Sequence, residues 1–124
     1  MEFDNSKPIY LQIVDKIKGQ LIRNELNIGD KIPSQRELAQ RLKVNPNTVQ
    51  RAYNEMEIMG MVETLRGQGT FICKKPEMLK EIKEEMLENI MGRFFHDIKS
   101  LGYEDEEIVD LIDRWQIKLG EGEK

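Results

Sequence analysis

The sequence predicts a mainly α-helical protein with one small β-hairpin, divided into a first domain over residues 1–75 and a two-helix domain over residues 76–124. Two helix-start signals follow Ile32 in close succession, and a glycine-containing hairpin pattern comes after them. Beyond Lys75 the composition turns acidic, and apolar residues recur every three or four positions. Together these observations predict a compact helical domain with a hairpin, followed by a pair of helices.

The first helix-start signal is Ser34 followed by Glu37, which forms a capping box. In this motif the serine oxygen and the glutamate carboxylate each accept a hydrogen bond from a backbone N–H that the helix leaves unpaired. Leu38, Ala39 and Leu42 then fall on one face. A helix is therefore predicted to begin at Ser34 and to end near Lys43.

The second signal is Asn45, a good N-cap residue, followed by Pro46, which suits the first helical position. Gly60 is suited to end this helix. Residues at helical spacing are expected to pack inward: Val49, Ala52, Tyr53, Met56 and Met59. The opposite face is polar and consists of Asn47, Gln50, Arg51 and Asn54. A polar face on such a helix is typical of a recognition helix that reads base edges in a DNA major groove.

Two short strands are predicted at residues 61–65 and 70–73, joined by the turn Arg66-Gly67-Gln68-Gly69. This hairpin is the pattern of a wing, and Lys31-Ile32 is a short extended piece suited to pair with it. Before them, a helix is predicted from Pro8 to about Asn24, and residues 1–7 are expected to form an extended lead-in. The apolar face of that helix is Tyr10, Ile13, Val14, Ile17 and Leu21. The first domain is thus predicted to be a winged helix-turn-helix.

This domain resembles the DNA-binding domain of the GntR family of bacterial transcription regulators. The resemblance extends upstream through Pro8-Ile9-Tyr10 and Gly29-Asp30-Lys31. It is carried at the family's spacing by Pro33, Ser34, Arg36, Leu38, Ala39, Thr48, Val49, Ala52, Tyr53, Gly60, Gly67, Gly69, Thr70 and Phe71. It implies double-stranded operator DNA as the partner.

The candidate DNA-binding residues are Ser34, Gln35, Arg36, Asn45, Pro46, Asn47, Thr48, Gln50, Arg51, Arg66, Gly67, Gln68 and Gly69. Arg36 matches an arginine that reaches DNA in the family. Amide side chains suit adenine edges, Arg51 suits guanine or a phosphate, and a wing arginine suits a minor groove. In some branches of the family, arginines stand where this chain has Pro46 and Gln50, so the operator sequence is not carried over.

Structural interpretations of the same residues stay open. Ser34 and Asn45 each suit a helix cap, and the wing glycines suit a bare turn. Arg36 suits a surface ion pair with a neighbour. Tyr53 is expected in the core, with its hydroxyl within reach of a phosphate at the rim.

The charge distribution agrees with a DNA-binding first domain. The net charge is −4, but residues 1–75 carry 12 Lys and Arg against 9 Asp and Glu, whereas residues 76–124 carry 7 against 14. The first domain is therefore mildly basic, at +3, and the second acidic, at −7. A field this weak predicts modest non-specific affinity for DNA.

Length and composition exclude several other classes of protein. A chain of 124 residues leaves little room for an enzyme domain beside the wing, and no nucleophile, base and orienting group occur together. No apolar run approaches the roughly 20 residues of a membrane span, and the N-terminus lacks a signal-peptide core, so the cytoplasm is the expected location. His96 is the single histidine and Cys73 the single cysteine, so neither a metal nor another cofactor is expected.

The second domain is predicted to be two amphipathic helices separated by Gly102, with Gly120–Lys124 frayed. Two helices cannot enclose a core alone, so a helical homodimer is expected. The expected dimerisation residues are Leu79, Ile82, Met86, Ile90, Phe94, Ile98, Ile108, Leu111, Ile112 and Trp115. A short two-helix domain of this kind resembles the YtrA branch of the GntR family. That resemblance implies a homodimeric repressor, commonly of an ABC-transporter operon.

The soft and aromatic residues of the second domain, such as Met91 and Phe95, suit either a helical core or a pocket for a small hydrophobic effector. For the whole chain, the leading hypothesis is a homodimeric, sequence-specific DNA-binding repressor that recognises a palindromic operator. The alternative is a winged-helix protein-interaction module without specific DNA binding, because winged helices also serve as docking scaffolds.

Overall fold

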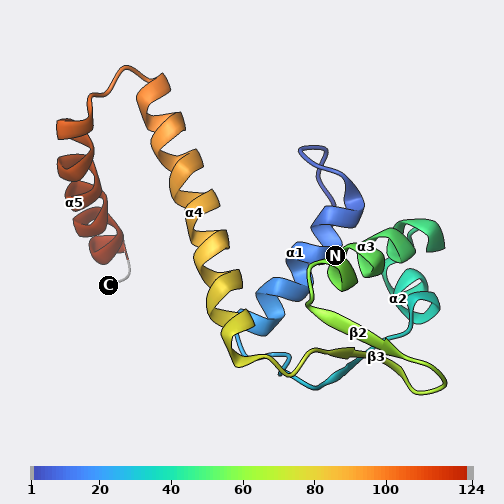
Figure 1. Cartoon of the computed structure of the whole chain (residues 1–124). Coiled ribbons are helices and arrows are strands. Elements are labelled where there is room, and N and C mark those ends of the chain that lie inside the picture. Colours follow the sequence, from blue (N-terminus) through green and yellow to red (C-terminus); the bar gives the residue numbers. More distant parts are fainter. Residues whose placement is uncertain (1, 123–124) are drawn as a thin grey trace. The chain divides into compact units, whose positions relative to one another are not determined.

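A computed structural model describes residues 2–122 of the chain (Figure 1). The chain forms two compact units, one ending at Lys83 and the other beginning at Glu84. The change in composition at Lys75 coincides with the start of a long helix, whereas the first compact unit continues through the first two turns of that helix. The division into functional domains at this point stays a prediction.

The first unit is a three-helix fold with a small antiparallel sheet. Its elements are α1 (Ile9–Ile22), β1 (Lys31–Ile32), α2 (Gln35–Leu42), α3 (Pro46–Ile58), β2 (Val62–Leu65), β3 (Gly69–Ile72) and the beginning of α4 (Pro76–Ser100). The sheet order is β1-β3-β2, with Lys31 opposite Phe71 and Val62 opposite Ile72. This arrangement confirms the predicted winged helix-turn-helix, including the pairing of the short first strand with the wing.

Helix α3 lies at the centre of the first unit, where it packs against α1, α2 and β2 (Figure 1). The predicted inward residues of α3 are fully buried, namely Val49, Ala52, Tyr53 and Met56, each with 0% of its surface exposed. The prediction was wrong for Met59, which is 40% exposed at the C-cap of the helix. The prediction that Tyr10 belongs to the core was also wrong, because this residue is only half-buried.

Both helix-start predictions are confirmed by cap hydrogen bonds. The Ser34 Oγ accepts the backbone N–H of Glu37 at 3.1 Å, and the Asn45 Oδ1 accepts that of Asn47 at 2.8 Å. Pro46 occupies the first turn of α3, where its missing N–H costs no helical hydrogen bond. The caps therefore fix where the two helices begin and which faces they present.

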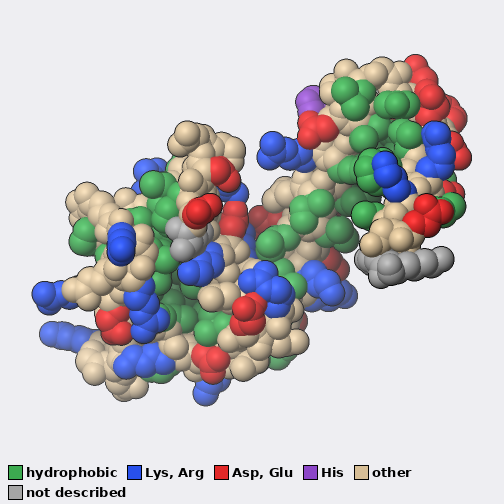
Figure 2. All heavy atoms as spheres, turned by 180° about the vertical axis from the view of Figure 1, so that it is seen from behind, with side chains coloured by type: hydrophobic (Ala, Val, Ile, Leu, Met, Phe, Trp, Pro, Cys, Tyr) green, Lys and Arg blue, Asp and Glu red, His purple; other side chains and the backbone are tan. Residues whose placement is uncertain are grey.

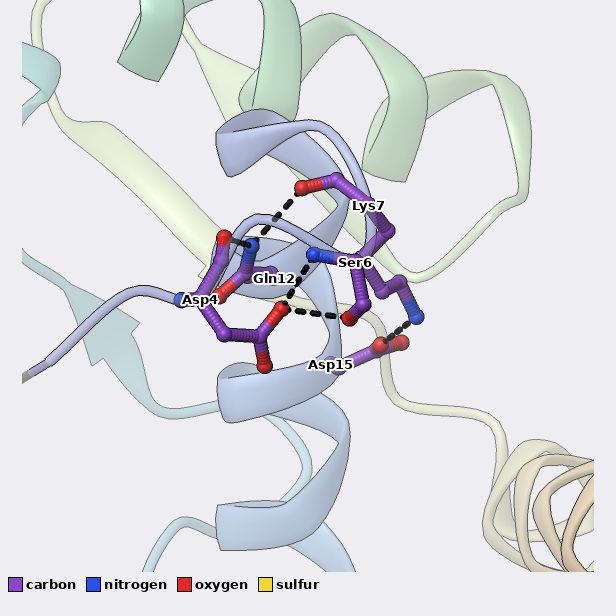
Figure 3. A network of polar contacts seen from close by, with 5 residues as sticks. All are labelled: Asp4, Ser6, Lys7, Gln12 and Asp15. Atoms are coloured by element: carbon purple, nitrogen blue, oxygen red, sulfur yellow. Dashed lines mark hydrogen bonds and ion pairs between the residues drawn. The ribbon is translucent and has the colours of Figure 1, made fainter.

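The segment before α1 is not the extended lead-in that was predicted. Gln12, which is 9% exposed, donates from Nε2 to the carbonyls of Asp4 at 2.9 Å and Lys7 at 2.8 Å (Figure 3). Ser6 donates its backbone N–H to the Asp4 carboxylate at 2.8 Å, and Lys7 pairs with Asp15. The chain therefore folds back over the start of α1. Met1 lies outside the described residues.

Tyr53 joins α3 to the residue before the N-cap of α2. Its hydroxyl donates to the Pro33 carbonyl, and burial raises the pKa of Tyr53 to about 12. Tyr53 is fully buried, which confirms that it belongs to the core and leaves no surface for the alternative contact with a phosphate. The hydrogen bond links α3 to the chain just before α2.

We expect Tyr53→Phe to lower the free energy of unfolding by about 1–3 kcal/mol, because the Pro33 carbonyl loses its donor while the ring packing is kept. Denaturant unfolding at neutral pH measures the loss. Because the folded state keeps Tyr53 neutral above its ordinary value of 10.0, the contribution of this residue should disappear as the pH rises from about 10 to about 12. A Phe variant that shows the same loss in this window as the parent protein would contradict the assignment.

The second unit comprises the rest of α4 and the helix α5 (Asp105–Gly122). Gly102, with a φ of 94°, occupies the turn between them, and Lys99 pairs with Asp105 across it at 2.8 Å. Helix α5 continues through Gly120, so the predicted fraying is wrong up to Gly122, and residues 123–124 lie outside the described part. None of the helices that the structure describes is long and apolar enough to cross a membrane.

An apolar groove of about 600 Å³ lies between α4 and α5 in the second unit. Its lining is Ile90, Met91, Phe94, Ile98, Leu101, Tyr103, Leu111, Ile112, Trp115, Gln116 and Leu119. Ile108 is 1% exposed within this unit and Ile82 is 5% exposed within the first unit. These two residues are therefore already covered in a single chain, which corrects the expectation that they are available for dimerisation.

Candidate nucleic-acid interface

Helix α3 presents a polar face on a fully buried scaffold. Asn47, Gln50, Arg51 and Asn54 are all exposed, and Thr48 is half-buried beside them. The inward face is rigidly packed, so the exposed side chains project from a fixed backbone. The structure thus brings together the residues that the helical spacing placed on one surface, and their amides and guanidinium suit hydrogen bonding to base edges or phosphates.

The first turn of α2 contributes a second group of polar residues. Ser34 and Asn45 use their side-chain oxygens as caps, so these atoms serve the helices themselves. Arg36 is exposed, and no described carboxylate pairs with it; its neighbour Glu37 lies instead 3.9 Å from Arg41. Gln35 is half-buried at the start of the helix. The guanidinium of Arg36 is therefore the positive charge in this turn that is available to an anion.

The wing carries its charge at the tip. Arg66, Gly67 and Gln68 are exposed, and the Gln68 N–H closes the turn by donating to the Leu65 carbonyl at 2.9 Å. Gly69 has a φ of 122°, and a Cβ there would lie 2.6 Å from the Cε of Lys31. Lys31 on β1 therefore lies against the wing; the sequence predicted the pairing of Lys31-Ile32 with the hairpin but did not place Lys31 among the site residues.

A side-chain network connects the wing to α3. The Thr64 hydroxyl on β2 donates to the Glu57 carboxylate on α3 and lies 3.1 Å from the hydroxyl of Thr70 on β3. Thr70 is buried. These contacts link the hairpin to the C-terminal part of α3.

Arg51 has an aromatic partner from α1. Its guanidinium carbon lies 4.0 Å from the centroid of the Tyr10 ring. A hollow of about 390 Å³ surrounds the pair, lined by Pro8, Ile9, Tyr10, Asn47, Thr48 and Arg51. Sequence reasoning placed Tyr10 in the core, since helical spacing cannot reveal which partner a boundary residue meets.

The first unit carries a small excess of positive charge. Figure 2 shows Lys and Arg side chains projecting from the rim of the first unit, at the left of the view. The excess of Lys and Arg over Asp and Glu in residues 1–75 is 12 against 9. Groups of three or more His, Cys, Asp or Glu that could hold a metal ion are absent from the described residues.

Residues 9–72 match the family described as "Bacterial regulatory proteins, gntR family". The chain belongs to the GntR family. This GntR protein is 51% identical over 111 residues to the HTH-type transcriptional regulator YhcF of Bacillus subtilis (strain 168), covering 90% of this chain and 92% of that protein. It is 37% identical over 121 residues to the HTH-type transcriptional repressor YtrA of the same organism, covering 97% of this chain and 93% of the repressor.

Solved structures agree with the fold of this GntR protein. A GntR family transcriptional regulator from Listeria monocytogenes matches with a TM-score of 0.81 and 35% identity, covering 90% of this chain and 98% of the other. The DNA-binding domain of AraR in complex with its operator ORR3 matches with a TM-score of 0.52 and 25% identity, covering 59% of this chain and 88% of that domain.

These findings confirm the leading hypothesis at the level of the family. This GntR protein is a DNA-binding transcription regulator, and its relatives include the YtrA type. The matched family and relatives are regulators rather than enzymes, as length and composition predicted.

Proposed function

We propose that two copies of this chain bind a palindromic operator as a repressor in the cytoplasm, each copy reading one half-site. The observation that carries the proposal is the exposed polar face of α3 on a fully buried scaffold, linked to the wing by a hydrogen bond. The name of the YtrA relative, a transcriptional repressor, supports repression. Half-sites spaced by one DNA turn, about 34 Å, or a multiple of it would suit two such helices.

The residues divide by role. Asn47 and Gln50 contact base edges from the exposed face of α3, because amides suit adenine. Arg36 contacts a phosphate, and Arg66 enters the minor groove with Gly67 and Gln68 near the backbone. The remaining candidates support these contacts from helix starts and the hairpin: Ser34, Gln35, Asn45, Pro46, Thr48 and Gly69.

We assign the groove of the second unit to a second copy of this chain. The lining contains no Asp, Glu, Lys, Arg or His within the described residues, and Trp115 remains 56% exposed in it. Further apolar side chains outside the groove are also exposed, namely Leu87, Val109 and Ile117. Figure 2 shows apolar side chains gathered on this unit. An interface of this kind uses the same patch on both copies, which suits a two-fold axis and a palindromic operator.

A small hydrophobic effector is the other occupant that this groove admits. Sites for small ligands usually combine apolar walls with a few convergent polar groups that fix orientation. Here the polar side-chain atoms come only from Tyr103, Trp115 and Gln116. The groove therefore favours a partner helix. A thermal-shift panel of hydrophobic metabolites is expected to leave the melting temperature unchanged, and a stabilising compound would support an effector instead.

A gel shift on the DNA upstream of the protein's own gene tests the proposed function. A specific band at moderate salt, competed by the same duplex but not by a shuffled one, is expected. The alternative function is that of a protein-interaction module, which agrees with the acidic net charge of −4. A protein that shows no preference between the two duplexes would favour docking to another protein.

The two arginines outside α3 offer a quantitative test. We expect Arg36→Ala and Arg66→Ala each to weaken operator binding, because each removes a cation from the DNA surface. Where the contact is a phosphate, the slope of log affinity against log salt should fall by about 1 for each bound copy, which is about 2 for a dimer. Titrations at several salt concentrations measure it. The control is Arg93→Ala in the second unit, where the arginine pairs with Asp97 at 3.8 Å. Unchanged binding in both variants would remove these arginines from the interface.

A further inference from the structure

Tyr10 and Arg51 come from different helices and meet at the edge of the polar face of α3. The distance of 4.0 Å between the guanidinium carbon and the ring centroid is well within the range of a cation–π interaction. Arg51 is exposed, and no carboxylate in the described part of the chain forms an ion pair with it. The aromatic ring is therefore its partner, and the N–H groups of the guanidinium stay available to an anion.

The ring is a fixed platform rather than a mobile surface group. The chain before α1 is tied to the second turn of that helix, because Gln12 bonds to the backbone of both Asp4 and Lys7 (Figure 3). Farther along α1, Ile13 and Val14 are buried in the core. Along the chain, Tyr10 lies between the tied segment that precedes α1 and the buried residues Ile13 and Val14. The backbone of Tyr10 is therefore anchored, and its ring offers Arg51 a stacking surface before any ligand binds.

The hollow around the pair is lined by groups that complement a sugar-phosphate strand of DNA. Its lining combines apolar side chains from Pro8 and Ile9 with donors from Thr48 and Arg51. An apolar wall suits a deoxyribose, and the donors suit the phosphate that follows it. Arg51 thus lies at the edge of the polar face beside this hollow, whereas Gln50 lies outside the hollow.

We propose that Tyr10 is a positioning residue for DNA binding, whose ring holds the Arg51 guanidinium so that it binds one backbone phosphate. The inference rests on the proposed function, in that α3 must enter the major groove. It assigns Arg51 to a phosphate, where the sequence left phosphate and guanine open. The ring contributes by pre-organisation, because an arginine that is already held loses less side-chain freedom on binding.

The test compares Tyr10→Phe, Tyr10→Leu, Arg51→Ala and the double variant Tyr10→Leu/Arg51→Ala. Two probes are used: a duplex selected by the parent protein from a random-sequence library, and a mixed-sequence duplex at low salt. We expect Tyr10→Phe to bind like the parent and Tyr10→Leu to bind about two- to five-fold more weakly on both probes. Arg51→Ala should lower the salt slope by about 1 for each bound copy, and Tyr10→Leu should add nothing to it.

Arg51→Lys provides the same test without altering Tyr10 or the packing of α1. Lysine keeps the charge but lacks the planar group that stacks on a ring. The salt slope should therefore be kept while affinity falls, because lysine loses both the planar stacking on the ring and the bidentate hydrogen bonds to a phosphate. Thermal unfolding of each variant establishes that the fold is intact, and should Tyr10→Leu not fold, Arg51→Lys decides the question.

Four results would overturn the inference. Additive losses in the double variant would mean that Tyr10 acts independently of Arg51. Equal weakness of Tyr10→Phe and Tyr10→Leu would assign the effect to the hydroxyl. A loss in Arg51→Ala confined to the selected duplex would indicate a base contact, and an Arg51→Lys variant that binds like the parent would dismiss the stacking. By contrast, a parent protein that binds neither probe would remove the proposed function as well, so the two failures are distinguishable.

Discussion

Trp115→Glu is expected to make the protein monomeric and to weaken binding to a full palindromic operator by about 10²- to 10⁴-fold. Trp115 lines the apolar groove of the second unit and is 56% exposed in the single chain. A glutamate there would have to be desolvated in the interface, whereas the isolated unit would keep it in water. Two linked copies of α3 bind an operator far more tightly than one copy does. Separating the two copies therefore removes this gain in affinity without altering any DNA contact.

Light scattering after size exclusion measures the mass, and a gel shift on full and half operators measures affinity. The control is Asn89→Asp, which adds the same charge at an exposed position of α4 outside the groove. Both variants should bind the half operator equally, because the first unit, which contacts the DNA, is intact in each. A dimer that survives Trp115→Glu, or a loss of affinity equal on both operators, would remove the groove as the dimer interface.

The second large effect is expected from Gln50→Ala in the polar face of α3. Gln50 is exposed on α3, where its amide can form two hydrogen bonds to an adenine. Losing such a contact costs about 1–3 kcal/mol, which is roughly a 5- to 150-fold loss of affinity. Preference at one base pair in each half-site should relax, while the salt slope stays unchanged because no phosphate contact is lost.

Selection of binding duplexes by the parent protein and by the variant measures this change in preference. Gln40→Ala is the matched control, since Gln40 is an exposed glutamine on α2 outside the proposed contacts. The variant and the control should have equal melting temperatures, because both side chains are exposed. A Gln50→Ala protein that selects the parent's site with the parent's affinity would show that Gln50 does not contact a base.

The sequence was sufficient for the helix starts and the hairpin because those signals are local. Ser34 and Asn45 bond to backbone groups within three residues, and the turn at Gly67 depends only on its own backbone. The polar face of α3 could also be predicted, since it follows from the period of a helix. Met59 was misplaced although its backbone is still helical, with φ −74° and ψ −9°, because the period of a helix does not show how far along it the neighbouring elements cover its face.

By itself, the sequence determined the order of elements, their boundaries to within a few residues and the face that α3 presents, because each depends on groups close together in the chain. Only the tertiary structure decided that Tyr10 stacks on Arg51 and that the Tyr53 hydroxyl donates to the Pro33 carbonyl. These contacts join residues distant in sequence. Local patterns cannot specify them, because the partners meet only after the helices and strands have packed.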